Sequence, residues 1–451
     1  MVGHGAGCQH LIKAPIGVGH TVGMSSRRRL GLSVGVAGVL LFSGCATDPA
    51  PPTTAQLSKA PSVTFQQIGI DQVRAESAEV VTATRDLGVA LAQAEPDTGG
   101  TNRVVSPWSA MTALGMVRAG ADGTTADELD RALGPYRPKA LAALLGQLDV
   151  IGGDPGTVDE DNPPTPPVYR QGTGAFVQKS SSLGRQYLTD LSSFFDTGVY
   201  PIDFRTPQAA NAINEWIAVN TGGQITQAPV PPDPETVFSL LSTVYLGAAW
   251  DRPFTQTIDD GTFTTGPGRT VPTAMMSQTD DFRLARGAGW TALELPYGGG
   301  GLAMQVVLPD VGASVGSTLS GAVLGAVSDG LKRARPAEVS VTMPRWKIEQ
   351  TVDLAPVLEG LGARRMFTSD ADLSAIGEDV FVSGAAQSAT ITVGEKGTVA
   401  AAVTQVAMTT TGLPPEQPET FDADRPFVYQ IVDTSTSLPL FLGVVANPTA
   451  N

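Results

Sequence analysis

The sequence predicts an α+β protein, in which a helical first third is followed by a part built mainly of antiparallel β-sheet. Three observations carry this prediction. Helix-capping patterns recur in the chain before residue 220, and β-rich segments dominate beyond Val237. The helical and β-rich segments do not alternate regularly along the chain. With 451 residues, 42% of them hydrophobic, the chain can bury a sizeable core.

The expected helices are marked by apolar periodicity and by capping residues. A first helix follows Asp71, with apolar residues at helical spacing: Val73, Val80, Leu87 and Leu91. A second helix should begin with Ser106 as N-cap and Pro107 as first helical residue, and stop at Gly120. The residues from Thr125 to Glu128 form a capping-box pattern that would open a third, short helix ending at Gly134.

The middle of the chain changes from helix to strand. Residues 152–167 are acidic and rich in proline and glycine, which predicts an exposed loop, and a helix is expected over residues 207–220. Beyond Val237, five segments are strand-like: LSTVYLGAAW, ALELPYGGGGLAMQVVLP, VSVTMPRWKI, ATITVGE and PFVYQIVDTSTSLPLFLGVVANP. The second segment should turn at Gly298–Gly301 and the last near Asp433–Ser437.

The N-terminal region has the pattern of a secretory signal. Met24 can start translation, Arg27–Arg29 form a basic cluster, and the apolar run Leu30–Phe42 leads through small residues to Cys45. This order resembles a bacterial lipoprotein signal, which implies cleavage before Cys45 and lipidation of its thiol. The apolar run is shorter than the ~20 residues that a membrane span needs. We therefore expect residues 1–44 to be removed, 45–64 to be a flexible tether, and the protein to be secreted and lipid-anchored to the outer face of the bacterial cell membrane.

Removal of residues 1–44 restricts the chemistry of the mature chain. All three histidines (His4, His10 and His20) and Cys8 lie in that part, so His-based catalysis and His-ligated zinc are excluded. A Ser-Lys or paired-carboxylate hydrolase survives this restriction, although no residue spacing indicates one. We expect no metal and no cofactor. The formal net charge of −15 becomes −19, because four positive and no negative charges are lost, and this argues against a nucleic-acid partner.

Several motifs after residue 65 together resemble the serpin family of serine protease inhibitors. They are Asn102 with Ser106-Pro107, INEWIAVNTGGQI (213–225), VYLGAAWDRPF (244–254), VPTAMMSQ (271–278), ALELPY (292–297), MPRWKIE (343–349), FDADRPFVYQIVD (421–433) and FLGVVANP (441–448). The chain departs from the family at Ser242, where asparagine is common, and at Gln387, where many members have histidine. The resemblance implies one serpin domain over residues 65–451, with a reactive loop at 395–420.

The resemblance assigns a role to the uncharged ribbon that begins at Gly397. In inhibitory serpins a protease attacks the exposed loop and forms an acyl-enzyme, and the cut loop then inserts as a strand and traps the protease. The hinge of that loop would comprise Glu395, Gly397, Thr398, Ala400, Ala401, Ala402 and Thr404. Alternate residues from Thr398 would face the core, and they are uncharged. Arg345 stands where the family has a basic partner for Glu395.

Counting along the family pattern places the scissile bond at Thr411-Gly412, with Met408 or Thr410 as the second choice. A small, β-branched residue at the cut implies a serine protease with a small apolar pocket, elastase-like or subtilisin-like, and possible attack by a cysteine protease. We expect a monomer. Two alternatives remain open on the sequence: a non-inhibitory serpin that acts as a surface-binding protein, and a solute-binding lipoprotein, against which the β-rich second half argues.

Overall fold

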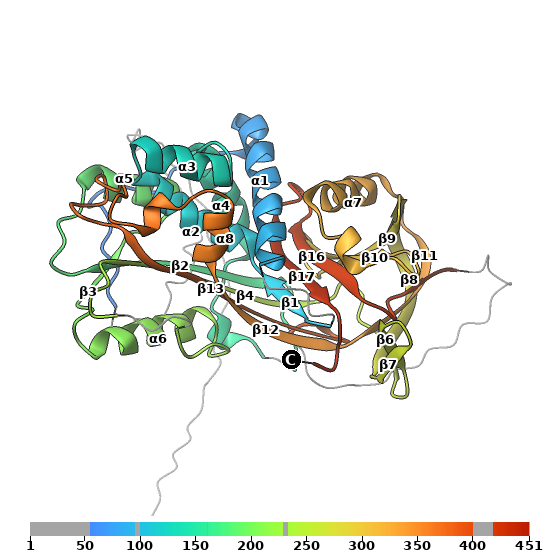
Figure 1. Cartoon of the computed structure of the whole chain (residues 1–451). Coiled ribbons are helices and arrows are strands. Elements are labelled where there is room, and N and C mark those ends of the chain that lie inside the picture. Colours follow the sequence, from blue (N-terminus) through green and yellow to red (C-terminus); the bar gives the residue numbers. More distant parts are fainter. Residues whose placement is uncertain (1–54, 95–99, 160, 229–232, 400–417, 451) are drawn as a thin grey trace, which may run out of the picture. The chain divides into compact units, whose positions relative to one another are not determined.

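The structure is a computed structural model, and it describes residues 55–94, 100–159, 161–228, 233–399 and 418–450 (Figure 1). Cys45, most of the predicted hinge and the predicted scissile bond lie outside these residues. The described residues belong to one compact unit. Within them, no helix combines the length and the apolar character needed to cross a lipid bilayer.

Eight α-helices are found in the described part. Six of them precede residue 221 in the sequence, in agreement with the predicted helical N-terminal part. The helices are α1 (Arg74–Ala92), α2 (Pro107–Ala119), α3 (Gly123–Leu133), α4 (Pro138–Leu148), α5 (Arg185–Phe194), α6 (Gln208–Asn220), α7 (Gly321–Arg333) and α8 (Leu354–Gly360). Short 3-10 turns, which connect the longer elements, are η1 (Ile70–Gln72), η2 (Asp149–Ile151), η3 (Pro155–Thr157), η4 (Val315–Ser317) and η5 (Arg365–Phe367).

A six-stranded sheet forms the centre of the molecule. Its order is β12-β13-β14-β4-β2-β3, and β13 also pairs directly with β4. The strands are β2 (Val168–Gln178), β3 (Tyr200–Ile202), β4 (Phe238–Ala249), β12 (Trp346–Asp353), β13 (Val382–Gly394) and β14 (Gly397–Thr398). Most neighbours are antiparallel, but β13 with β4 and β2 with β3 are parallel.

A second, nine-stranded sheet has the order β1-β17-β16-β10-β9-β8-β11-β15, and β5 pairs with β8. All its pairs are antiparallel except β11 with β15. Its strands are β1 (Arg103–Val105), β5 (Gln256–Ile258), β8 (Met275–Gly287), β9 (Trp290–Pro296), β10 (Leu302–Pro309), β11 (Ala337–Pro344), β15 (Glu419–Asp422), β16 (Phe427–Asp433) and β17 (Pro439–Val445). A separate hairpin consists of β6 (Thr262–Gly266) and β7 (Arg269–Pro272).

The six-stranded sheet is covered on both faces. Helices α2, α3, α4 and α5 lie on one face and α6 lies on the other (Figure 1). The main core joins the first face to the nine-stranded sheet and includes Trp108 and Leu114. A smaller core forms beneath α6, where Trp216 packs edge-on against Phe176 at a centroid distance of 5.5 Å. The α+β prediction is therefore confirmed.

The predicted caps of the second helix are present, whereas the start of the third was placed wrongly. Ser106 accepts a hydrogen bond from the Ser109 amide, and Gly120 follows the last residue of α2. Helix α3 begins at Gly123 instead of after Thr125. Thr125 lies inside α3 and accepts a hydrogen bond from Asp372 N (2.9 Å), and the Glu128 carboxylate also binds a distant segment. Thr125 and Glu128 therefore bind distant segments of the chain and do not cap the start of α3.

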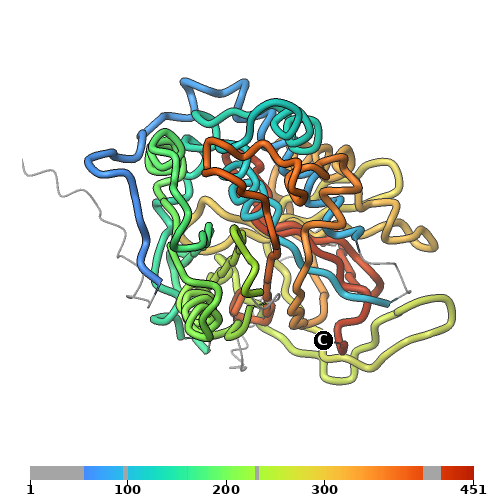
Figure 2. Tube along the Cα trace, turned by 60° about the vertical axis from the view of Figure 1, so that its left-hand side comes forward, coloured from blue at the N-terminus to red at the C-terminus, as the bar shows by residue number. Residues whose placement is uncertain are grey.

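The predicted tether is described only from Ala55 onward, and there it contacts the fold. Ala55 and Ala60 are buried, and Ser58 pairs with Val199 through two backbone hydrogen bonds of 2.7 and 3.0 Å. Lys59 forms an ion pair with Asp196 at 2.8 Å. Figure 2 shows this segment, in blue, running beside the green part of the chain. Residues 55–60 of the predicted tether are therefore bound to the chain that immediately precedes β3.

Candidate functional site

The six-stranded sheet opens between its two central strands. From Val382 to Ala389, β13 pairs in parallel with β4 as far as Val244. Beyond that level the two strands separate, and β14 lies between them. Thr398 is paired with Val393 of β13 on one side and with Ala248 of β4 on the other, both antiparallel. The beginning of the uncharged ribbon is therefore already a strand of this sheet.

The turn between β13 and β14 is bound by the segment that follows β4, Trp250–Phe254, which we name the hinge cradle. Three consecutive carbonyls of the turn accept hydrogen bonds from it. The indole Nε1 of Trp250 donates to Gly394 O (2.9 Å), the amide of Phe254 to Glu395 O (2.8 Å), and the amide of Trp250 to Lys396 O (2.9 Å). These bonds fix where the chain reverses direction and hence the register of β14.

Gly397 is needed for close approach of the backbone. A Cβ built on Gly397 would lie 2.0 Å from the carbonyl oxygen of Ala248, which belongs to the paired strand β4. Because that neighbour is backbone, a side chain at this position would displace either β14 or β4. The glycine of the predicted hinge therefore has a steric function in the native sheet.

Thr398 is buried in the site, with an exposed fraction of 1%. Its hydroxyl oxygen lies 2.6 Å from the phenolic oxygen of Tyr297, whose ring stacks on Trp250 at a centroid distance of 4.6 Å. Burial raises the pKa of Tyr297 above its ordinary value, so the phenol stays protonated, and either hydroxyl can donate in this hydrogen bond. The inward orientation expected for Thr398 is observed.

Val399 is the last described residue before the loop, and it leaves the strand conformation. Its amide still donates to Thr392 O of β13 (2.7 Å), but its φ is +66°. A β-branched residue in this left-handed region is strained by about 1–3 kcal/mol. Continuation of β14 would require Val399 to return to an extended conformation and would release this strain.

The charged residues of the turn bind neighbouring segments. Glu395 is largely buried and lies 3.6 Å from Arg345, so the ion pair expected from the sequence is present. The carboxylate of Glu395 also accepts a hydrogen bond from the hydroxyl of Thr257 (3.2 Å). Lys396 donates to Asp161 O at 2.9 Å in the acidic loop.

Below the opening, helix α2 holds both central strands together. The amide side chain of Gln387 on β13 makes two hydrogen bonds with the backbone of Ser106, each 2.8 Å. Ser242, the partner of Gln387 on β4, contacts the hydroxyl of Ser109. If β13 and β4 separate further at this level, their contacts with Ser106 and Ser109 at the start of α2 must change. Ser242 and Gln387 are both positions where the sequence departs from the serpin pattern.

The structure thus places Glu395, Gly397 and Thr398 of the predicted hinge together at the opening. Ala400, Ala401, Ala402, Thr404, Thr411, Gly412 and the lipidation candidate Cys45 lie outside the described residues. Tyr297, Thr257 and the hinge cradle were not identified from the sequence, because each contacts the hinge across more than a hundred residues. No group of histidine, cysteine and acidic residues that could hold a metal ion is found in the described part.

Comparison with known proteins agrees with this architecture. A family model described as serpin (serine protease inhibitor) matches residues 82–448. An uncharacterized serpin-like protein of Thermococcus kodakarensis is 32% identical over 363 residues, which cover 78% of this chain and 82% of that protein. The leukocyte elastase inhibitor of Bos taurus is 30% identical over 365 residues, or 77% of this chain and 93% of that protein.

A solved structure is similar over most of its length. The thermophilic serpin tengpin in its native state has a TM-score of 0.73 and 25% sequence identity, covering 87% of this chain and 99% of that one. The sheet opening, the hinge geometry and these comparisons lead to the same assignment. The chain belongs to the serpin family, a family of serine protease inhibitors and not of enzymes.

Proposed function

We propose that this protein is a suicide-substrate inhibitor of serine proteases, with its reactive bond at Thr411-Gly412. The protease serine attacks the Thr411 carbonyl, the amine of Gly412 leaves, and Thr411 stays bound to the protease as an ester. The freed loop then enters the six-stranded sheet between β13 and β4. The observation that carries the proposal is the position of Gly397 and Thr398, which already pair with both strands.

The register of β14 supports insertion of the residues that follow. If both antiparallel ladders continue, Thr404 comes to lie opposite Ser242 and Gln387, the small polar pair beneath α2. The residues from Ala400 to Thr410 are uncharged, so insertion buries no unpaired charge. Each new backbone hydrogen bond contributes about 0.5–1.5 kcal/mol, and about a dozen of them formed together make insertion effectively irreversible.

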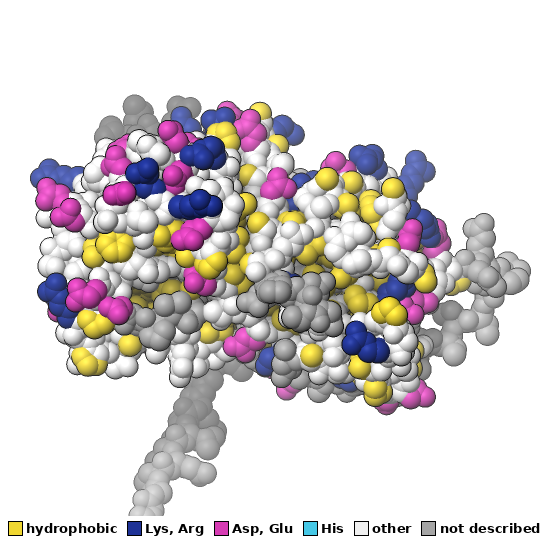
Figure 3. All heavy atoms as spheres, in the orientation of Figure 1, with side chains coloured by type: hydrophobic (Ala, Val, Ile, Leu, Met, Phe, Trp, Pro, Cys, Tyr) yellow, Lys and Arg dark blue, Asp and Glu magenta, His cyan; other side chains and the backbone are white. Residues whose placement is uncertain are grey.

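The residue at the proposed cleavage site supports a protease with a small apolar pocket as the target. Thr411 is compact and uncharged, and the relative named leukocyte elastase inhibitor belongs to the same family. Lys, Arg, Asp and Glu are interspersed on the face seen in Figure 3, which does not favour a phosphate-rich partner there. An elastase-like or subtilisin-like enzyme is the expected target.

The decisive experiment incubates the protein with a panel of serine proteases. Elastase-like enzymes and subtilisin should form a denaturant-stable complex of summed mass, and the released C-terminal fragment should begin at Gly412. The variant Thr411→Arg should shift inhibition toward trypsin-like enzymes. Cleavage without any complex would instead support a non-inhibitory serpin, and a cut outside residues 408–413 would contradict the assigned reactive bond.

We further propose that the protein is anchored to the outer face of the bacterial membrane by a lipid on Cys45, on the basis of the signal pattern alone. A radioactive fatty acid added to growing cells should label the wild-type protein. Cys45→Ala should abolish the label and leave the precursor uncut. Labelling that persists in the Cys45→Ala variant would contradict the anchor.

A further inference from the structure

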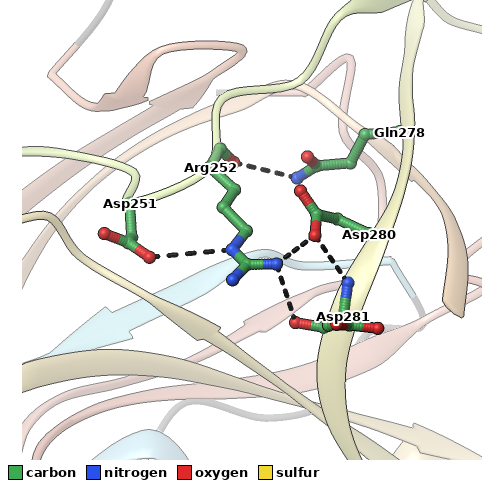
Figure 4. A network of polar contacts seen from close by, with 5 residues as sticks. All are labelled: Asp251, Arg252, Gln278, Asp280 and Asp281. Atoms are coloured by element: carbon green, nitrogen blue, oxygen red, sulfur yellow. Dashed lines mark hydrogen bonds and ion pairs between the residues drawn. The ribbon is translucent and has the colours of Figure 1, made fainter. Parts of the chain in front are cut away.

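The hinge cradle, Trp250–Phe254, is itself held in place by strand β8. It provides the three donors that bind the turn of the hinge, yet it has no regular secondary structure. Figure 4 shows that Gln278, Asp280 and Asp281, all from β8, surround Arg252 at the middle of the cradle. The position of the hinge therefore depends on a strand of the other sheet.

Gln278 makes the buried contact of this group. Its side-chain amide donates to the carbonyl oxygen of Arg252 at 3.0 Å, and Gln278 is 6% exposed. Arg252 lies midway between the two cradle residues whose amides bind the hinge, Trp250 and Phe254. The Arg252 carbonyl belongs to the peptide that joins Arg252 to Pro253, and the proline ring fixes one of the two dihedral angles between this peptide and the Phe254 amide. The hydrogen bond from Gln278 therefore restricts the direction in which the Phe254 amide points toward the hinge.

The guanidinium of Arg252 adds contacts at the surface. It forms an ion pair with Asp280, lies 3.7 Å from the Asp251 carboxylate, and donates to Asp281 O at 3.4 Å. The side chains of Arg252 and Asp280 are 38% and 42% exposed, so water and salt weaken this pair. The buried amide of Gln278 is expected to matter more than the exposed ion pair.

We infer that Gln278 is a positioning residue for the inhibitory reaction: it holds the hinge cradle so that Gly397 and Thr398 remain inserted before any protease arrives. This inference rests on the proposed inhibitory function. With the first two residues already paired, insertion only has to extend an existing strand, and it does not have to start one. Without Gln278 the hinge would leave the sheet more often, insertion would begin later, and more acyl-enzyme would be hydrolysed.

The test compares wild type with Gln278→Met, which keeps the side-chain length and removes the amide donor. Hydrogen–deuterium exchange of the free protein is measured in peptides covering residues 249–256 and 390–399. We expect the amides that bind the hinge, and that of Val399, to exchange about three- to tenfold faster in the variant. The number of inhibitor molecules consumed per protease inactivated should rise at least about twofold.

Arg252→Met and Arg283→Met serve as a matched pair. Both remove an arginine, but Arg252 belongs to the cradle, whereas Arg283 lies further along β8 and pairs with Glu294 at 3.9 Å. Arg252→Met should raise exchange in the two hinge peptides about twofold, and Arg283→Met should leave it unchanged. Because Arg252 is exposed, its variant is expected to fold, and unchanged exchange in its hinge peptides would contradict support of the cradle by β8 even if Gln278→Met does not fold.

Unchanged exchange in the hinge peptides, or an equal rise throughout β8 and β9, would overturn the inference. If wild type traps no protease, the proposed inhibitory function fails, but the exchange measurement still decides whether Gln278 and Arg252 hold the hinge. The two failures are therefore distinguishable.

Discussion

Thr398 is the first side chain of the ribbon that lies between the two central strands, and every later residue must follow it. It is buried against Tyr297, so the variant Thr398→Arg would place an unpaired guanidinium there, at a cost of several kcal/mol. We expect the hinge to be expelled and the variant to be cleaved and released as a substrate. The measurement is the number of inhibitor molecules consumed per protease inactivated, which should be near one for wild type and much larger for the variant.

Val399→Glu is the matched control, because Val399 is only partly buried and, by strand alternation, its side chain is expected to face away from the core, opposite to Thr398. Inhibition by this variant should be intact or slightly improved. Replacing valine by an unbranched residue also removes part of the steric conflict at positive φ. Full inhibition by Thr398→Arg would contradict the trapping mechanism, and loss of inhibition in Val399→Glu would contradict the assigned orientation.

At the level of elements, α3 is joined to the segment before β13 by one carboxylate. Glu128 accepts hydrogen bonds from the backbone amides of Arg365 (2.8 Å) and Arg364 (3.0 Å). The Arg365 amide, followed by that of Arg364, lowers the pKa of Glu128, and partial desolvation opposes them. Because the folded-state pKa is lowered, the stabilisation is present above the ordinary glutamate pKa and is lost as the pH falls through the lowered value.

Glu128→Gln should therefore lower the free energy of unfolding by about 1 kcal/mol at pH 7, since charge-assisted hydrogen bonds become neutral ones. The difference from wild type should shrink as the pH falls below about 4. Denaturant unfolding at both pH values measures it. Asp127→Asn in the same helix is the control and should have a smaller effect. A difference that stays constant with pH would exclude the carboxylate as its source.

The elements that were predicted well are those whose signals are local. Ser106 and Gly120 bound α2 as expected, because caps satisfy backbone groups within one turn. Thr125 and Glu128 carried the same local signal but bind segments more than two hundred residues away. Helix α7, capped by Ser320, lies within the strand-rich half and was not predicted. The parallel pairing of β13 with β4 joins segments far apart in the sequence, and periodicity gives no information about such partners.

The candidate site shows the same division. The Glu395–Arg345 pair and the inward orientation of Thr398 could be predicted from the family pattern and from strand alternation. Gln278 could not, because a glutamine on a strand has no local signature of the backbone carbonyl that it will bind. The need for glycine at position 397 likewise depends on the approach of β4 and not on neighbouring residues.

For the whole molecule, loop insertion should convert a strained, open sheet into a fully paired one. Cleavage of the loop in wild type should therefore raise the melting temperature by at least about 15 °C, since a gain of several kcal/mol moves Tm by a few degrees per kcal/mol. Calorimetry before and after treatment with a protease that cuts the loop measures this. The Thr398→Arg variant, cut at the same bond, should gain much less. No gain in cleaved wild type would support a non-inhibitory serpin.

The register of β14 also sets a distance. As an extended strand, the chain from Thr398 to Thr411 covers about 43 Å, at roughly 3.3 Å per residue. If the inserted strand keeps the register in which Thr398 pairs with Ala248, Met408 will pair with Phe238, the first residue of β4. The acylated residue would then lie just beyond the far end of β4. The proposed reactive bond therefore lies one full strand length from the hinge. The inserted loop can pair with β4 along its whole length by the time the attached protease reaches the opposite end of the sheet.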